Sequence, residues 1–397
     1  MTGRILSASR GAALGAAVAL VAGCGEPVDP SGVYDLTFDL TPADMRAQLT
    51  IPGGDVEGGM LLLRGLRTQQ FGSVDMVTAG DSLTLRFAPN AELRLGLRGD
   101  SVHGVYLLSS VDTILVRGVR TGAPPDSAVV AALGPRRQAP GVLSTDEQGD
   151  LLPTFGAGRL LLTRSSPDWR RHVLVATEQE GEGWAAPQAL PFSGGTWNDR
   201  GAAFAPGDSL LVFSSDRPLP GDSAGGDWNL WSVARTADGW AEPAPLAINS
   251  DSVDFHPSIS DDGTLYFSSR RTGGMGGADI WRAARGAAGW QEPANLGGGI
   301  NGEWDEGSVF VAPDGSWLLV SVTERPGGLG SEDLWLAERS GNGWDELRNP
   351  GAPLNSFAAE YGATLETGGA ALWFTSHRRG LADLYRLPLD EAGISGG

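Results

Sequence analysis

A short phrase that recurs at nearly constant intervals constrains this chain more than any other feature. Gly-Trp pairs begin at residues 183, 239, 289 and 343, so the intervals are 56, 50 and 54 residues. Once per interval, an Asp or Asn is followed by an aliphatic and an aromatic residue, as in Asp279-Ile280-Trp281. A period of this length is typical of folds that stack copies of one supersecondary unit. We therefore expect an array of like units in the C-terminal part of the chain.

One unit is composed of four predicted strands, and the third unit shows them best. FHPSIS (255–260) is followed by an Asp-Asp-Gly turn and then by TLYFSSR (264–270). A glycine-rich loop leads to DIWRAAR (279–285), and the unit ends with GWQEPANLG (289–297). Four antiparallel strands at a period near 50 residues are typical of a propeller blade. Five such units begin near residues 150, 199, 254, 305 and 360.

The last unit has no Gly-Trp strand, and its missing strand is predicted upstream. Residues 139–143 (APGVL) resemble EPAPL (242–246) and EPANL (292–296) of the complete units. We expect strand 138–144 to complete the last blade and to close a five-bladed β-propeller over residues 138–390. A six-bladed ring is the alternative, if part of 121–144 forms extra strands.

A break in composition separates this region from a different N-terminal domain. All 13 tryptophans lie at or after Trp169, and residues 25–144 contain none. Residues 32–120 alternate apolar and polar positions between turn signals, which predicts about eight short strands. The fold class is therefore all-β, with a small antiparallel β-barrel or sandwich (32–120) before the propeller. Residues 121–137, rich in Pro, Ala and Gly, are the predicted linker.

The first residues indicate export. Arg4 and Arg10 precede an apolar stretch of small residues that is too short to span a bilayer. This stretch ends in Val21-Ala22-Gly23-Cys24, which resembles the lipobox of bacterial lipoproteins. The resemblance implies that a signal peptide (1–23) is removed and that Cys24 carries the lipid, followed by a tether (24–31). Gly25, where an aspartate would favour the inner membrane, implies an outer-membrane location; an ordinary secretory signal is the alternative.

The repeat phrases also carry a family resemblance. HPSISDDGTLYFSSRRTGGMGGADIW and DEGSVFVAPDGSWLLVSVTERPGGLGSEDLW look like the WD-like repeats of TolB-type propellers of the bacterial envelope. The resemblance covers about residues 145–389 and implies the fold. It is much less specific for function, because propellers host many functions.

The candidate site follows from the repeat and from its departures. Each unit has an acid just before its innermost strand, so the acids should lie at equivalent places and form an acidic axial mouth that attracts cations or basic peptides. The alternative is that each acid bonds backbone amides at a turn of its own blade. Arg200, His256 and Tyr361 break the pattern next to these acids. The candidate ligand-binding residues are therefore Asp199, Arg200, Asp254, His256, Asp305, Glu306, Glu360 and Tyr361.

Composition excludes several function classes. The formal net charge is −19, which disfavours binding to nucleic acid. One cysteine and four histidines predict no metal centre, and no cofactor is expected. Since no G-x-S-x-G motif is present, we expect a membrane-anchored lipoprotein that binds an envelope protein, peptide or glycan without catalysis. The alternative is a carbohydrate-active hydrolase that uses two of the axial carboxylates.

Overall fold

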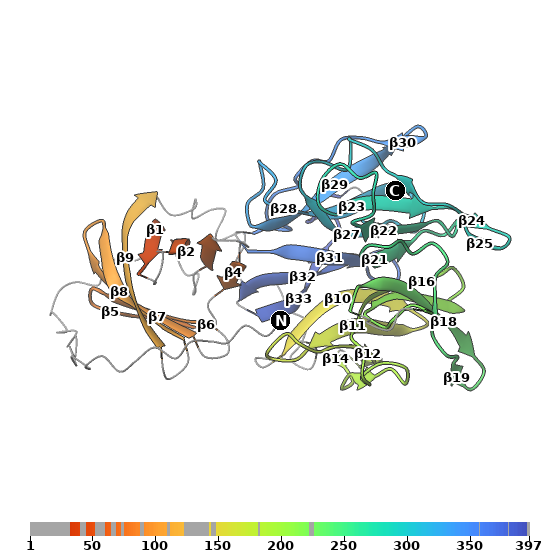
Figure 1. Ribbon diagram of the computed structural model, residues 1–397, viewed down its shortest axis with the longest axis horizontal. Helices are drawn as coiled ribbons and strands as arrows, with labels where there is room; N and C mark the ends of the chain where they lie inside the picture. The colour runs from red at the N-terminus through yellow and green to blue at the C-terminus, as the bar shows by residue number, and fades with distance from the viewer. Residues whose placement is uncertain are drawn as a thin grey trace.

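The computed structural model describes most of the chain after residue 31 and shows an all-β protein (Figure 1). The described residues are 32–39, 45–51, 60–64, 69–72, 75–87, 91–108, 112–122, 143, 148–181, 183–221, 226–356, 358–379 and 381–394. The predicted signal peptide, Cys24 and its tether lie outside them, as does most of 121–144. Within these ranges we find no helix that is long and apolar enough to cross a membrane.

The N-terminal domain is one antiparallel sheet of nine strands in the order β4-β3-β2-β1-β9-β8-β7-β6-β5. Its strands are β1 (Gly32–Phe38), β2 (Met45–Ile51), β3 (Met60–Arg64), β4 (Gln69–Gly72), β5 (Asp75–Ala79), β6 (Ser82–Phe87), β7 (Ala91–Arg98), β8 (Ser101–Leu108) and β9 (Asp112–Gly122). The ninth strand arises because the segment predicted as one strand, 72–78, is divided between β4 and β5.

The alternating pattern places one face of this sheet in a core. Leu83 and Leu85 of β6 are buried, as are Leu93 and Leu95 of β7. One apolar cluster joins side chains from β1, β2 and β6 to β9, which requires the sheet to curl around them. The domain is therefore a curled single sheet and not a sandwich of two sheets.

The remaining strands form five radial sheets, with short hairpins at their outer edges. The first sheet pairs β10 (Gly149–Gly156), β11 (Arg159–Ser165), β12 (His172–Thr177) and β15 (Gln188–Ala189), beside the hairpin of β13 (Gln179–Glu180) and β14 (Gly183–Trp184). The second contains β16 (Asp199–Phe204), β17 (Leu210–Ser215), β18 (Asn229–Thr236), β19 (Gly239–Trp240) and β20 (Ala244–Pro245).

The other three sheets repeat this pattern. The third pairs β21 (Asp254–Ile259), β22 (Leu265–Ser269), β23 (Asp279–Ala283) and β26 (Ala294–Asn295), beside the hairpin of β24 (Arg285–Gly286) and β25 (Gly289–Trp290). The fourth contains β27 (Asp305–Val311), β28 (Trp317–Thr323), β29 (Glu332–Ser340) and β30 (Gly343–Trp344). The fifth contains β31 (Glu360–Leu365), β32 (Ala371–Arg379) and β33 (Leu381–Pro388).

The five inner strands close into a ring. β10, β16, β21, β27 and β31 contact one another in that order, and β10 also contacts β31. Side-chain hydroxyls tie neighbouring sheets together at equivalent places: Leu152 N donates to Thr375 Oγ1 over 2.9 Å, and Gly201 N donates to Thr163 Oγ1 over 3.0 Å. These sheets therefore form a β-propeller, with five blades among the described residues.

Large aromatic side chains fill the space between blades. Trp184 of the first blade packs edge-to-face on Trp373 of the fifth, at a centroid distance of 5.8 Å. Leu143 belongs to the same cluster and is fully buried. It is the one described residue of the predicted closing strand 138–144, so the pairing of that strand stays a prediction.

Candidate functional site

The five acids at the heads of the inner strands are buried and do not form an open mouth. Their exposed fraction is 0% in every case: Asp150, Asp199, Asp254, Glu306 and Glu360. The predicted acidic funnel is therefore wrong as a solvent-facing surface. The physical reason is that a carboxylate at this place is surrounded by hydrogen-bond donors from its own blade.

Three of these acids have equivalent partners. Asp254 accepts from Ser269 Oγ at 2.6 Å, from Arg271 Nη2 at 2.7 Å and from the backbone N of Ser250 at 2.6 Å. Glu360 accepts from Ser376 Oγ, Arg378 and Ser356 in the same way, and Arg217 binds Asp199. A buried ion pair that is broken on one side leaves a charge without compensation, so these carboxylates are structural parts of their blades.

Asp150 and Asp305 are held differently. Asp150 pairs with Arg164 of the neighbouring strand, with Nε and Oδ1 2.7 Å apart. Asp305 is about half-exposed, and its Oδ1 accepts from Arg270 Nη2 and from Ala278 N, each over 2.8 Å. Asp305 therefore links its blade to the preceding one and does not face the axis with the other candidates.

Glu306 is the exception among the buried acids. Val322 stands opposite it in the strand pair, where Ser269 and Ser376 stand opposite Asp254 and Glu360. Two residues later, Glu324 replaces the arginine of the other blades. Gly302 N donates to Oε1 over 3.2 Å, and Oε2 has no partner among the described residues. Burial raises the pKa of Glu306 to about 8, so this carboxyl group carries a proton at neutral pH.

The three residues that break the repeat do come together near the axis. The Arg200 guanidinium lies 3.9 Å from the ring centroid of Trp228, and Tyr361 Oη lies 3.2 Å from His377 Nε2. Burial and the positive charge of Arg200 lower the pKa of His256 to about 3, so its imidazole is neutral. Burial also raises the pKa of Tyr361 and lowers that of Arg200 to about 10. The cluster therefore holds one cation and two neutral hydrogen-bonding groups.

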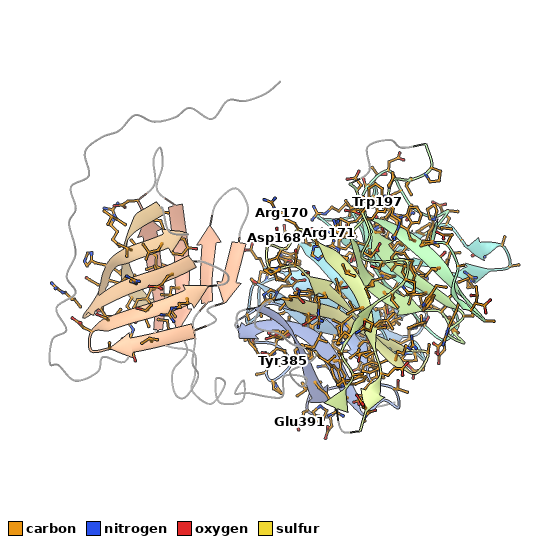
Figure 2. All side chains as sticks on the ribbon, turned by 90° about the horizontal axis from the view of Figure 1, so that it is seen from below. Asp168, Arg170, Arg171, Trp197, Tyr385 and Glu391 are labelled. Atoms are coloured by element: carbon orange, nitrogen blue, oxygen red, sulfur yellow. The ribbon has the colours of Figure 1, made fainter. Side chains whose placement is uncertain are left out.

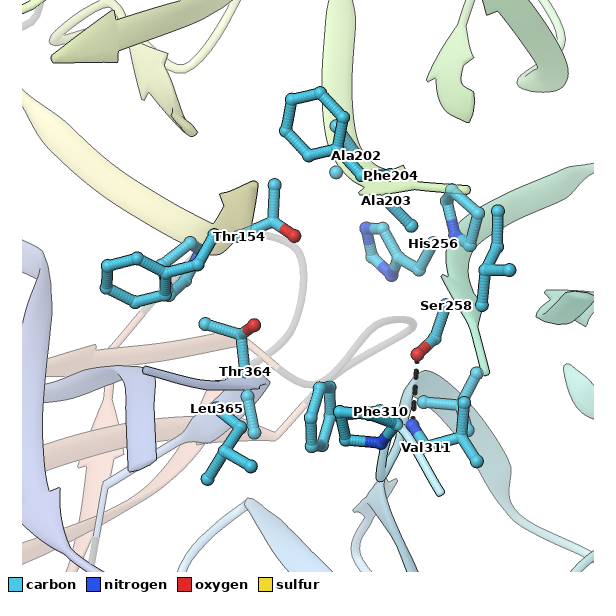
Figure 3. A pocket seen from close by; sticks show the side chains of 18 of the residues that line it. Thr154, Ala202, Ala203, Phe204, His256, Ser258, Phe310, Val311, Thr364 and Leu365 are labelled. Carbon is cyan, nitrogen blue, oxygen red and sulfur yellow. Dashed lines mark hydrogen bonds between the residues drawn. The ribbon is translucent and has the colours of Figure 1, made fainter. Parts of the chain in front are cut away.

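A cavity of about 240 Å³ lies on the propeller axis, and all five inner strands line it (Figure 3). His256 is part of its wall, and Figure 3 shows the imidazole pointing toward its centre. The residues four positions after each acid also line it: Thr154, Ala203, Ser258, Phe310 and Thr364. The cavity therefore combines hydroxyl groups, aromatic surface and one imidazole.

Sequence analysis missed these lining residues, apart from His256. The signal was present, because the fourth position after the acid changes from Thr to Ala, Ser, Phe and Thr around the ring, whereas a purely structural repeat position would keep one residue type. None of the four acids named for a hydrolase lines this cavity. Across the described ranges, no group of three His, Cys, Asp or Glu residues is placed to hold a metal ion.

Two tryptophans near the acids could in principle stack on sugar rings, and the structure separates them. Trp197 is 38% exposed, at a surface where Arg171 Nη1 donates to Thr196 O over 2.7 Å (Figure 2). Trp304 is partly buried in an interblade cluster, and the Arg325 guanidinium lies 5.1 Å from its ring centroid. Only Trp197 therefore offers an accessible ring face.

Comparison with known proteins identifies distant structural neighbours. Neither a family model nor a curated protein sequence matches the chain. Among solved structures, the chain is similar to a putative TolB from Agrobacterium tumefaciens, with 15% identity, a TM-score of 0.42, and coverage of 64% of this chain and 81% of that one. TolB from Acinetobacter baumannii is 16% identical, with a TM-score of 0.31 and coverage of 75% and 79%.

An enzyme is found at the same distance. The α-L-arabinofuranosidase PaAbf62A from Podospora anserina is 13% identical, with a TM-score of 0.40 and coverage of 64% of this chain and 94% of that one. Likenesses of this size carry no argument about function. The propeller fold rests on the strand topology, and the function must be argued from the site.

Proposed function

We propose that this chain is a non-catalytic binding protein of the bacterial envelope, whose propeller takes up part of a protein, peptide or glycan in its axial cavity. One observation carries the proposal: a cavity lined by all five blades combines hydroxyls and aromatic surface with the imidazole of His256. Concave sites with mostly apolar walls and a few convergent polar groups are the usual form of a ligand site.

The carboxylates argue for binding over hydrolysis. Glycoside hydrolysis uses two carboxyl groups on either side of the scissile bond. Here Asp199, Asp254 and Glu360 are buried in ion pairs with arginines. Glu306 has the raised pKa of a general acid, but it is fully buried and lies outside the cavity wall. These four acids are therefore poorly placed for that chemistry.

The envelope location in this proposal rests on the lipobox-like sequence that ends at Cys24. A diacylglycerol on the thiol and a further acyl chain on the new N-terminus would hold the protein stably, since one chain alone binds membranes only marginally. Anchoring also raises the effective concentration of the cavity near ligands of the same membrane. The outer membrane is the proposed membrane because Gly25 follows the cysteine.

A cavity-filling variant tests the proposal. Ala203 lines the cavity, and the equivalent position of the fourth blade is Phe310, so the fold already accepts phenylalanine at this place. We would compare wild type with Ala203→Phe in pull-downs from solubilised envelope, with mass spectrometry for proteins and glycan analysis for sugars. Ala237→Phe, on the exposed turn before Trp240, is the matched control.

Ligand captured by wild type and by Ala237→Phe, and lost with Ala203→Phe, would support binding at the axis. Equal capture by all three proteins would place binding elsewhere and overturn the proposal. Melting curves of both variants show whether the added ring has disturbed the fold.

A further inference from the structure

We infer, resting on the proposed function, that the axial cavity takes a neutral, hydroxyl-bearing ring, such as the terminal sugar residue of a glycan, and that His256 Nε2 accepts a hydrogen bond from one of its hydroxyls. Four observations lead to this ligand class. They are the tautomer of His256, the charges around the cavity, its free hydroxyls, and its size.

The tautomer of His256 follows from its one hydrogen bond. Nδ1 lies 2.7 Å from the backbone oxygen of Gly307, and a carbonyl oxygen can only accept. Nδ1 therefore carries the proton, and Nε2 of the neutral ring carries a lone pair. Nε2 is buried and has no hydrogen-bond partner among the described residues. A buried acceptor without a donor is costly, so a ligand that brings a donor would relieve that cost.

The charges around His256 favour a neutral donor. The field of Arg200 reaches the imidazole, since it lowers the pKa of His256, and it would repel a ligand ammonium group at the same place. A ligand carboxylate would face the lone pair of Nε2, and it would pass Asp208 and Asp261, which also line the cavity. A hydroxyl group donates a hydrogen bond without either penalty.

The other walls offer both donors and apolar surface. Ser258 Oγ accepts from Val311 N over 3.0 Å, which leaves its own hydrogen free to donate (Figure 3). The hydroxyls of Thr154 and Thr364 have no hydrogen-bond partner among the residues the structure describes. Phe204 and Phe310 line the cavity as well. A sugar ring presents hydroxyls at its edge and C–H groups on its faces, and this combination of walls fits both.

The volume limits how much of a ligand can enter. Clefts for drug-sized ligands measure about 300–1,000 Å³. At about 240 Å³, this cavity has room for one ring and not for a chain of them. The bound unit is therefore the end of a glycan, or a free monosaccharide.

The test uses a substitution that two other blades already contain. His256 has a φ of 51°, and Gly201 and Gly362 occupy the equivalent positions with φ values of 52° and 59°. Glycine adopts this conformation without strain, so His256→Gly should fold. The probes are methyl glycosides of glucose, galactose, mannose and N-acetylglucosamine, with glucuronic acid and glucosamine as charged counterparts. Saturation-transfer NMR and calorimetry would measure their dissociation constants.

We expect wild type to bind at least one neutral glycoside more tightly than either charged sugar, and His256→Gly to weaken that binding about tenfold, the effect of one hydrogen bond to a buried acceptor. Thr364→Val, which keeps the shape and removes a hydroxyl, should weaken it less. Trp197→Ala, at the exposed surface tryptophan, should change nothing.

Three results would overturn the inference. They are preferred binding of a charged sugar, unchanged binding by His256→Gly, and loss of binding with Trp197→Ala. If no sugar binds while Ala203→Phe still abolishes capture of an envelope component, the sugar inference fails and the proposed function stands. If wild type captures nothing and binds no sugar, both fail.

Discussion

Replacing the unpaired buried acid Glu306 by glutamine should stabilise the propeller, and only at neutral or higher pH. The ordinary pKa of this carboxyl is 4.5, and burial raises it to about 8 in the folded protein. Between these two values the unfolded chain has lost the proton and the folded chain keeps it. Stability is therefore fully present below pH 4.5 and decreases as the pH rises toward 8.

The magnitude follows from the width of that window. Each pH unit within it costs about 1.4 kcal/mol, so the loss between pH 5 and pH 7.5 is about 3 kcal/mol. Glutamine does not ionise and keeps an oxygen for Gly302 N. Relative to wild type, Glu306→Gln should therefore gain about 3 kcal/mol between those pH values, or about 8 °C in Tm for a domain of this size.

The assay is thermal and urea unfolding of both proteins at pH 5 and pH 7.5. Glu332 and Asp333 also have raised pKa values, of about 7 and about 6, because they are buried near other acids. Their contribution is common to wild type and variant, so the difference between the two proteins isolates Glu306. A stability difference that is the same at both pH values would refute the reasoning.

Glu360→Gln is the matched control, because the same substitution is made at the same place in the next blade. Glu360 is ionised beside Arg378 and accepts from Ser376 and Ser356. Glutamine there leaves Arg378 buried without its counter-charge, which should cost about 3 kcal/mol at pH 7.5. Stabilisation by both substitutions would show that the ring position, and not the missing arginine of the fourth blade, sets the effect.

Three further predictions concern single contacts. Arg271→Ala should destabilise the propeller by about 3 kcal/mol in urea unfolding, because Asp254 is left buried without its cation; a loss below 1 kcal/mol would contradict a structural role for this pair. Gly362→Ala should cost about 2 kcal/mol by the same measurement, since its φ is 59° and an added Cβ would lie 2.5 Å from Leu152 Cδ2. Phe38→Ala, in the core of the N-terminal sheet, should cost about 4 kcal/mol in an unfolding transition that leaves the propeller folded, and one shared transition for both domains would be evidence against their independence.

The fold was largely predictable because it depends on local patterns. A period of about 50 residues, the turns Asp-Asp-Gly and Pro-Asp-Gly, and the recurring aromatic of the third strand each specify strands that pair with their neighbours in the chain. Such pairing is decided within a few tens of residues, so a single sequence reveals it. The division of 72–78 between β4 and β5 was missed, because no turn residue other than Gly72 marks it.

The site was predictable only in part. Arg200, His256 and Tyr361 were recognised as departures from the repeat, and they do lie near one another around the axis. The acids were recognised as equivalent, but the expectation that they face solvent was wrong. Their partners Arg217, Arg271 and Arg378 follow the second strand of each blade, about 18 residues later, and the sequence does not show which way a side chain turns.

The sequence by itself determined that this chain forms repeated four-stranded units, that a tryptophan-free β-domain precedes them, and that equivalent acids mark the head of each unit. These features arise from periodicity and composition along the chain. Only the tertiary structure decided that arginines bury those acids, that Glu306 lacks its arginine, and that residues from five separate blades enclose a cavity beside His256. Contacts of this kind depend on side-chain direction and on ring closure, which bring together residues more than 200 positions apart.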